Sequence, residues 1–380
     1  MNRICFSNGR IVTADGVVDR IVLTLDGGRI AALSAGGDAD RTIDLDGGWM
    51  MPGFIDTQVN GGGGVLFNDD PTPEGVAAIA RAHMPYGTTA MLPTLISDDP
   101  SVIARALDAV DAAIDAGTPG IVGVHIEGPF LNVSRKGIHD SSKFRRLDTD
   151  TMALLTQGRR GRVMLTLAPE LADPAQIRAL AEAGVLVCGG HTDATYEETM
   201  AAIDAGLRGF THLYNAMSPL KHRAPGVVGA VLDDQTTWAG LIVDGAHLHP
   251  AVIRIAMRAR PVDRLMLVTD AMPTVGQADK RFTLQGKAIT VENGVCVNAD
   301  GTLAGSDLDM ATAVRNMVAT TGTAPETAAA MASTYPAAFL RLDDERGSIA
   351  AGMVADWVTL TAGFTVTGTW IGGEQVHAGE

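Results

Sequence analysis

Several features that define large classes of protein are scarce in this chain of 380 residues. It has only three cysteines, Cys5, Cys188 and Cys296, which lie far apart and form no Cys-x-x-Cys pair. Neither a disulfide framework nor a thiolate zinc site is therefore predicted, and we expect a reducing compartment, the cytoplasm. No apolar stretch is long enough to cross a bilayer, and the first ten residues contain no unbroken apolar segment of the kind found in signal peptides. We accordingly expect a soluble, unprocessed protein.

The chain also has fewer basic than acidic residues. There are 29 lysines and arginines against 44 aspartates and glutamates, which gives a formal net charge of −15. A partner such as nucleic acid or an anionic membrane would require a clustered basic face, so neither partner is expected. A small anionic substrate is not excluded, because a few local donors can bind it.

The chain is rich in hydrophobic residues, which make up 46% of it and can form a large core. Residues 1–50 and 346–380 show short apolar runs separated by Gly-rich turns, a pattern typical of β-hairpins. Chain ends often lie close together. We therefore predict a small β-sandwich domain formed by both ends of the chain and a larger domain over residues 51–345.

The larger domain alternates buried strands with alanine-rich helical segments such as 173–183 and 196–205. Eight strands are predicted, over residues 53–59, 89–95, 121–126, 163–167, 185–189, 209–213, 238–243 and 265–269. Eight parallel strands followed by helices predict a (β/α)₈ barrel. An open, doubly wound sheet is the alternative, but no Gly-x-Gly-x-x-Gly follows the first strand.

Four residues with acid or imidazole side chains stand at the ends of these apolar runs, namely Glu127, His191, His212 and Asp270. Barrel enzymes place catalytic residues at the carboxyl ends of their strands. One carboxylate and two imidazoles suit Zn²⁺ with an open position for water, and Asp270 could then serve as a general base. Taken singly, each has a structural alternative: a hydrogen-bonded buried histidine, a salt bridge for Glu127, or a helix N-cap for Asp270.

Longer motifs surround these residues. They are Met51-Pro-Gly-Phe-Ile-Asp-Thr-Gln-Val-Asn-Gly, His125-Ile-Glu-Gly-Pro-Phe, Gly190-His-Thr-Asp-Ala-Thr, Thr211-His-Leu-Tyr-Asn-Ala-Met, Asp244-Gly-Ala-His-Leu-His-Pro and Val268-Thr-Asp-Ala-Met. Along nearly the whole chain the sequence resembles the amidohydrolase superfamily and, within it, the N-acetylglucosamine-6-phosphate deacetylases.

The resemblance implies a distorted (β/α)₈ barrel with a small β-sandwich, and hydrolysis of N-acetylglucosamine 6-phosphate to glucosamine 6-phosphate and acetate. Glu127, His191 and His212 would hold a divalent metal, and Asp270 would be the acid–base residue. His139 would donate a hydrogen bond to the acetyl carbonyl oxygen and stabilise the developing oxyanion.

One segment departs from the superfamily pattern. Many members carry His-x-His after the first strand, whereas this chain has Gln58-Val59-Asn60. Amide side chains are weak metal ligands beside imidazole or carboxylate. We therefore predict a single metal ion per chain, Zn²⁺ first, with Fe²⁺, Co²⁺ or Mn²⁺ able to share the ligands. Gln58 would orient a water molecule or contact substrate.

The phosphate group requires donors, which the resemblance places after His212. The backbone N–H groups of Asn215 and Ala216 and the guanidinium of Arg223 would contact it. Arg223 would reach the active site of a neighbouring subunit, which implies a homodimer. His247 would contact the substrate, and the segment at Leu303 would line the sugar pocket.

Three alternatives remain open from the sequence. The substrate could be the galactosamine isomer or another N-acetyl sugar phosphate, because a single contact can distinguish epimers. The protein could be a different amidohydrolase, such as an N-acyl-amino-acid deacylase or a cyclic amidase. It could also be a non-catalytic barrel homologue that senses sugar phosphates or supports an assembly.

Overall fold

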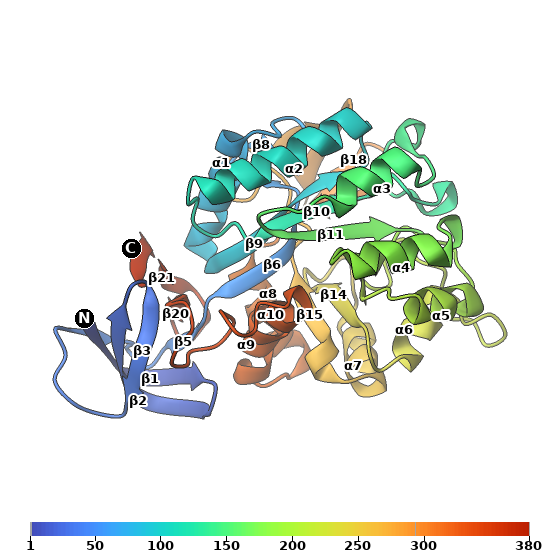
Figure 1. Ribbon diagram of the computed structural model, residues 1–380. Coiled ribbons are helices and arrows are strands. Elements are labelled where there is room, and N and C mark those ends of the chain that lie inside the picture. Colours follow the sequence, from blue (N-terminus) through green and yellow to red (C-terminus); the bar gives the residue numbers. More distant parts are fainter. Residues whose placement is uncertain (1, 293, 380) are drawn as a thin grey trace.

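Eight parallel strands form the centre of the molecule in the computed structural model, which describes residues 2–292 and 294–379 (Figure 1). They are β6 (Phe54–Val59), β9 (Thr88–Ile96), β10 (Gly123–Glu127), β11 (Arg162–Leu167), β12 (Leu186–Gly189), β13 (Gly209–Phe210), β14 (Trp238–Ile242) and β15 (Leu265–Val268). All eight predicted strands are confirmed within a few residues. The sixth is shorter than expected.

The ring of strands nearly closes where β15 meets β6. Val59 pairs with Ala271 in a parallel bridge, and the Asp270 N–H donates to the Gln58 carbonyl oxygen at 3.0 Å. The Asn60 N–H donates to the Ala271 carbonyl oxygen at 2.9 Å. The predicted barrel is therefore confirmed and the open, doubly wound sheet is excluded.

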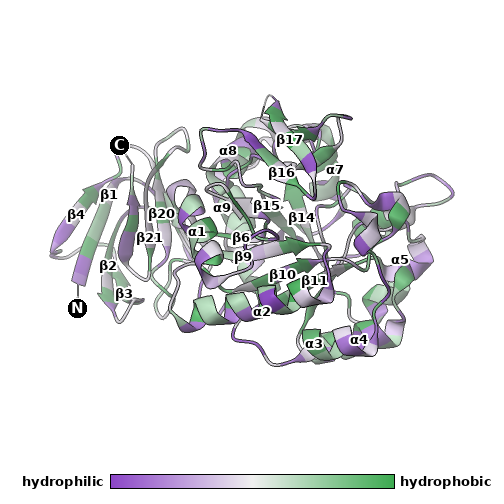
Figure 2. Cartoon of the chain, turned by 90° about the horizontal axis from the view of Figure 1, so that it is seen from above, coloured by the Kyte–Doolittle hydropathy of each residue, from purple (hydrophilic) through white to green (hydrophobic). Residues whose placement is uncertain are grey.

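Helices surround the barrel and cover its apolar strands. They are α1 (Pro73–His83), α2 (Pro100–Asp115), α3 (Thr149–Thr156), α4 (Pro174–Glu182), α5 (Tyr196–Asp204), α6 (Gly226–Asp233), α7 (Pro250–Ala259), α8 (Met310–Thr321), α9 (Pro325–Ala332) and α10 (Thr334–Leu340). Capping boxes at Asp173 and Thr195 begin α4 and α5 where the composition predicted helices. Outer helices such as α2 and α4 carry purple, hydrophilic segments in Figure 2, and the strands inside are mainly green and white. Among the described residues, no helix is long and apolar enough to span a membrane.

Both chain ends build one further sheet, seen on the left of Figure 1. Its strands are β1 (Asn2–Thr13), β2 (Gly16–Asp26), β3 (Arg29–Ser34), β4 (Arg41–Asp44), β5 (Trp49–Pro52), β20 (Trp357–Leu360), β21 (Val366–Ile371) and β22 (Glu374–Ala378). Strand β5 joins the two ends, because it pairs with β1 and with β20. The sheet has its own core, in which Phe6 packs against Trp357 with ring centroids 5.7 Å apart. The predicted small β domain from both ends is thus confirmed, and the boundaries near residues 50 and 346 stay predictions.

A small sheet inserted between β15 and α8 was not predicted. It contains β16 (Arg281–Leu284), β17 (Lys287–Glu292), β18 (Val295–Asn298) and β19 (Leu303–Ser306), joined in antiparallel order. A short hairpin of β7 (Gly61–Gly62) and β8 (Val65–Leu66) follows β6. Gln285-Gly286, Asn293-Gly294 and Asp300-Gly301 stand between short β-rich runs, and such X-Gly pairs could have indicated hairpins. Asp309 is the N-cap of α8, the helix that follows this sheet.

Candidate metal centre and active site

The four predicted residues all lie at the carboxyl ends of barrel strands. Glu127 is the last residue of β10, and His191, His212 and Asp270 each follow their strand by two residues. The backbones of those three have positive φ values of 47°, 35° and 54°. Non-glycine residues adopt this region at a cost of roughly 1–3 kcal/mol each, and such strain is concentrated at functional sites.

Glu127, His191 and His212 meet at one point. The Oε1 atom of Glu127 lies 3.2 Å from His191 Nε2 and 3.1 Å from His212 Nε2, and the two nitrogens are 3.1 Å apart. A tetrahedral zinc centre with bonds of roughly 2.0–2.1 Å separates its ligand atoms by about 3.3 Å. The three ligand atoms are therefore spaced as a tetrahedral divalent metal site requires.

Hydrogen bonds and charge support this arrangement. His191 Nδ1 lies 2.8 Å from the Arg135 carbonyl oxygen. A carbonyl can only accept, so this nitrogen carries the proton and leaves the Nε2 lone pair free for a metal. Burial opposes the charged form of Glu127, but its close contacts with His191 and His212 hold the pKa of its carboxyl well below the usual range. A neutral imidazole and a charged carboxylate are the forms that bind metals.

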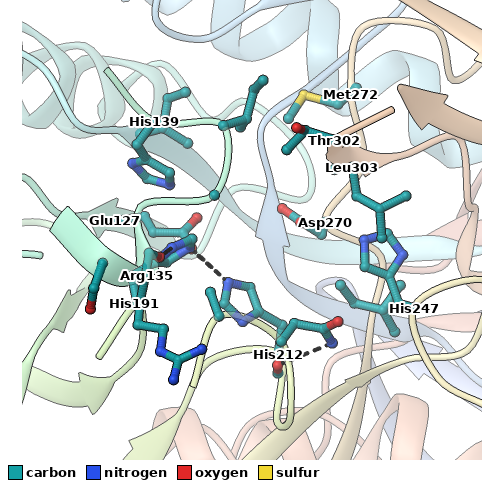
Figure 3. A pocket seen from close by; sticks show the side chains of 18 residues that line it. Glu127, Arg135, His139, His191, His212, His247, Asp270, Met272, Thr302 and Leu303 are labelled. Atoms are coloured by element: carbon teal, nitrogen blue, oxygen red, sulfur yellow. Dashed lines mark hydrogen bonds and ion pairs between the residues drawn. The ribbon is translucent and has the colours of Figure 1, made fainter. Parts of the chain in front are cut away.

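Asp270 faces this group across the cavity (Figure 3). Its Oδ1 atom accepts hydrogen bonds from Gln58 Nε2 at 3.0 Å and from Asn60 Nδ2 at 2.6 Å. Burial and the nearby Glu127 charge raise the pKa of Asp270 to about 6. A carboxyl group with a pKa near neutrality can both accept and return a proton. Gln58 Nε2 also lies 3.2 Å from Glu127 Oε2, so its amide faces both carboxylates.

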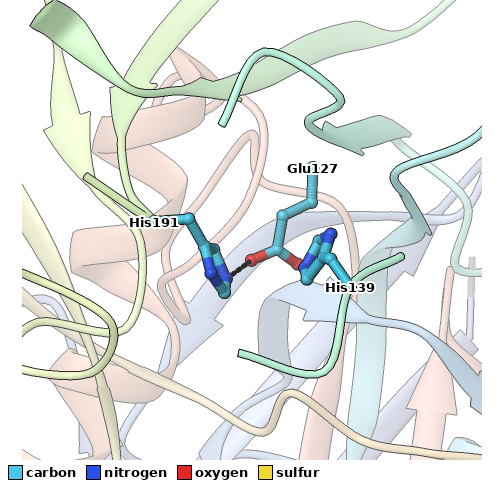
Figure 4. Close-up of side chains that lie close together, drawn as sticks. All are labelled: Glu127, His139 and His191. Atoms are coloured by element: carbon cyan, nitrogen blue, oxygen red, sulfur yellow. Dashed lines mark hydrogen bonds and ion pairs between the residues drawn. The ribbon is translucent and has the colours of Figure 1, made fainter. Parts of the chain in front are cut away.

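His139 lies beside the proposed metal ligands. In Figure 4 the Glu127 carboxyl lies between the His191 and His139 rings. One ligand atom from each of these three residues lies within 4.8 Å of the others. The Ser97 hydroxyl lies 2.8 Å from His139 Nδ1, and the Ser97 N–H donates to the same nitrogen at 3.4 Å. A backbone N–H can only donate, so Nδ1 accepts and Nε2 carries the proton. Burial and the neighbouring His191 lower the pKa of His139 to about 3, so its ring is a neutral donor.

The site opens into a cavity of about 380 Å³, a size suited to a small molecule. Nine of the eleven sequence-predicted site residues line it: Glu127, His139, His191, His212, Asn215, Ala216, His247, Asp270 and Leu303. Gln58 is buried below the cavity and reaches it through its contacts with the two carboxylates. Arg223 does not line the cavity. It is exposed on the loop before α6.

Other residues of the site were not found from the sequence. Arg135 lines the cavity and forms an ion pair with Asp193 at 2.8 Å. Asp244 Oδ2 lies 2.7 Å from His247 Nδ1 and fixes that ring. The Asp-x-x-His spacing could have indicated the Asp244–His247 pair, whereas nothing local marks Ser97 as the partner of His139.

Comparisons with known proteins agree with this geometry. The model of the Amidohydrolase family matches residues 49–376. N-acetylgalactosamine-6-phosphate deacetylase from Shewanella sp. is 40% identical, covering 98% of this chain and 95% of its own. N-acetylglucosamine-6-phosphate deacetylase from Bos taurus is 37% identical, with coverage of 98% and 95%. The crystal structure of N-acetylglucosamine-6-phosphate deacetylase from Pasteurella multocida superposes with a TM-score of 0.95 at 34% identity, covering 99% of this chain and 100% of its own. The chain therefore belongs to the amidohydrolase family.

Proposed function

We propose that the protein is a metal-dependent deacetylase that hydrolyses the amide of N-acetylglucosamine 6-phosphate to glucosamine 6-phosphate and acetate. The observation that carries this proposal is the convergence of Glu127, His191 and His212 opposite Asp270 in one cavity. Relatives that act on N-acetyl amino sugar 6-phosphates align over nearly the whole chain, which supports the substrate class.

One divalent metal ion per chain, Zn²⁺ first, would be held by Glu127, His191 and His212. When bound, such an ion acts as a Lewis acid that lowers the pKa of water and polarises an amide carbonyl. Gln58 and Asn60 direct their N–H groups at Asp270, which supports a single metal over two. Fe²⁺, Co²⁺ and Mn²⁺ use the same ligand types.

The chain's own residues supply the proton transfers. Asp270 removes a proton from the attacking water and then protonates the departing amine, which is a poor leaving group without that proton. His139 donates its Nε2–H to the acetyl oxygen as negative charge develops there. The neutral ring suits this role. The Ser97 N–H donates to Nδ1, so the proton of the ring is on Nε2.

The phosphate would be bound by the backbone N–H groups of Asn215 and Ala216, and the sugar by His247 and the Leu303 segment. Arg223 cannot serve its own cavity from its exposed loop in this conformation, which supports a homodimer in which it reaches the partner's site. The three free, buried cysteines support a reducing, cytoplasmic location.

N-acetylgalactosamine 6-phosphate is the second candidate substrate, because the Shewanella relative at 40% identity is named for that isomer. A cyclic amidase is less well supported, because no lysine that could be carbamylated is among the described residues lining the cavity. A non-catalytic homologue would have little use for a carboxylate placed opposite the metal ligands.

Acetate release from purified, metal-loaded protein tests the proposal. The two 6-phosphates are assayed side by side, with an N-acyl amino acid and a cyclic amide as controls. Release from N-acetylglucosamine 6-phosphate with the higher kcat/KM supports the first candidate, and a higher value for the galactosamine isomer supports the second. Bound metal without acetate release from either sugar phosphate would refute both.

A further inference from the structure

The tip of the inserted sheet contacts the segments that hold His139. Gln285 lies between β16 and β17, where Gln285 and Gly286 have φ values of 48° and 79° and form a tight hairpin turn. Its Oε1 atom accepts from the Asp140 N–H at 2.7 Å, and its Nε2 atom donates to the Ser97 carbonyl oxygen at 2.8 Å. The oxygen and the nitrogen of the Gln285 amide are therefore both hydrogen-bonded to backbone groups.

Both backbone groups belong to residues next to His139. Asp140 is the next residue in the chain, and Ser97 is the residue whose N–H and hydroxyl fix His139 Nδ1. One side chain thus joins the loop that carries the ring to the segment after β9 that orients it. The sheet itself is anchored there, because Leu284 and Ile289 belong to the same apolar cluster as Ile96 and Ile138.

We propose that Gln285 is a positioning residue for the deacetylation reaction, which holds His139 with its Nε2–H directed at the acetyl oxygen. The inference rests on the proposed function, in which His139 is the donor to that oxygen. Gln285 does not line the cavity and acts through the two backbone groups. The inserted sheet would then contribute to turnover through Gln285 as well as through Leu303, which lines the cavity.

A second set of contacts limits the size of the effect. Lys143, four residues after His139, forms ion pairs with Asp98 at 3.3 Å and with Asp99 at 2.5 Å. The loop therefore stays attached to the segment after β9 when the Gln285 amide is removed. Loss of Gln285 should loosen the ring but leave the loop folded.

The test is a double-mutant cycle of Gln285→Leu with His139→Ala. Removing an oxyanion donor outright lowers kcat on the order of 10²–10³-fold. We expect Gln285→Leu alone to lower kcat about 10- to 50-fold, a smaller loss because the donor remains, with KM changed by less than about threefold. In the His139→Ala background, the same substitution should change kcat by less than about twofold, because no ring is left to position. Gln285→Glu keeps the acceptor for the Asp140 N–H and should give an intermediate loss.

Thr283→Ala is the matched control, because this exposed residue lies on the same hairpin and has no hydrogen bond to the described residues around His139. It should match the parent protein in kcat, melting temperature and metal content. Ring ¹⁵N spectra of histidine-labelled protein add a measurement that does not depend on turnover. The His139 signals, assigned by their loss in His139→Ala, should shift from one tautomer towards a mixture in Gln285→Leu and stay unchanged in Thr283→Ala.

The outcomes separate this inference from the proposed function. An equal loss of kcat in both backgrounds, or an unchanged kcat and unchanged ring spectrum in Gln285→Leu, would overturn the positioning role alone. An unchanged kcat in His139→Ala would overturn the donor role and the inference with it. If the parent protein released no acetate, the proposed function would fail. An unchanged His139 ring spectrum in Gln285→Leu would still refute the positioning of His139 by Gln285.

Discussion

Asp56 provides a strong test of the energetics of the barrel, because its carboxyl group is completely buried below the active site. It lies on β6, at the junction with β15. Its Oδ1 atom accepts from the N–H groups of Gln58 at 3.1 Å and Thr269 at 3.3 Å, and its Oδ2 atom lies 2.5 Å from the Thr269 hydroxyl. Burial outweighs these hydrogen bonds and raises the pKa of Asp56 from 3.8 to about 7.

The sign of the effect follows from proton binding. Between pH 3.8 and about 7 the folded protein keeps a proton on Asp56 that the unfolded chain has released. The stability therefore falls as the pH rises through this window and is lowest above it. Each unit of pKa difference corresponds to roughly 1.4 kcal/mol, so the full window amounts to about 4 kcal/mol and the part above pH 5 to about 2–3 kcal/mol.

Asp56→Asn reproduces the protonated acid. The amide oxygen can accept from the same two N–H groups, and the amide nitrogen can face the Thr269 hydroxyl. We predict that the variant lacks this part of the pH dependence. Above pH 7 its free energy of unfolding should exceed that of the parent protein by up to about 4 kcal/mol.

The assay is equilibrium unfolding in urea at pH 5 and pH 8, on protein stripped of metal by a chelator so that metal binding does not contribute. The difference between parent and variant cancels the titration of groups that do not interact with Asp56, and Asp270→Asn in both backgrounds removes the charge that does. Asp15→Asn, which changes an exposed acid in the turn after β1, is the control and should follow the parent. A variant with the same pH dependence as the parent, or with lower stability at pH 8, would refute the reasoning.

Three further predictions concern the site. Asp270→Asn should retain its metal, measured by elemental analysis, but lose on the order of 10²–10⁴-fold in kcat, because the proton acceptor is gone; near-normal turnover would remove Asp270 from the mechanism. Glu127→Ala and His191→Ala should purify without stoichiometric metal, because each deletes one of three ligands, and full occupancy in both would place the ion elsewhere. Arg223→Ala should raise KM for the 6-phosphate about tenfold with little change in kcat, since it removes a binding contact only. The same KM for both proteins would contradict the role of Arg223 in the phosphate site.

Much of this arrangement could be predicted because barrel strands are buried on both faces and appear as unbroken apolar runs. The residue that ends such a run lies at the carboxyl edge of the barrel. Glu127, His191, His212 and Asp270 could therefore be predicted to lie close together, although the sequence gives no distances between them. The sequence could not give the positive φ of His191, His212 and Asp270, which arises from the turn that follows each strand.

The inserted sheet and its contacts were missed for a different reason. Its strands are short, and their alternation is weak beside the barrel runs. The contacts of Gln285 with Asp140 and Ser97 span 145 and 188 residues. Only the folded barrel brings these segments together, so local pattern could not indicate them.

The departure at Gln58 and Asn60 connects the number of metal ions with the acid–base residue. Both amides direct a hydrogen-bond donor at the same oxygen of Asp270. The hydrogen bond from Asn60 favours the charged carboxylate, whereas burial and the Glu127 charge favour the neutral acid, and the balance raises the pKa of Asp270 to about 6. Imidazoles in place of the two amides could bind a second metal ion, whose positive charge would lower the pKa of this carboxyl. In the proposed mechanism, the amide pair would favour a single metal and keep Asp270 basic enough to take a proton from water and return it to the amine.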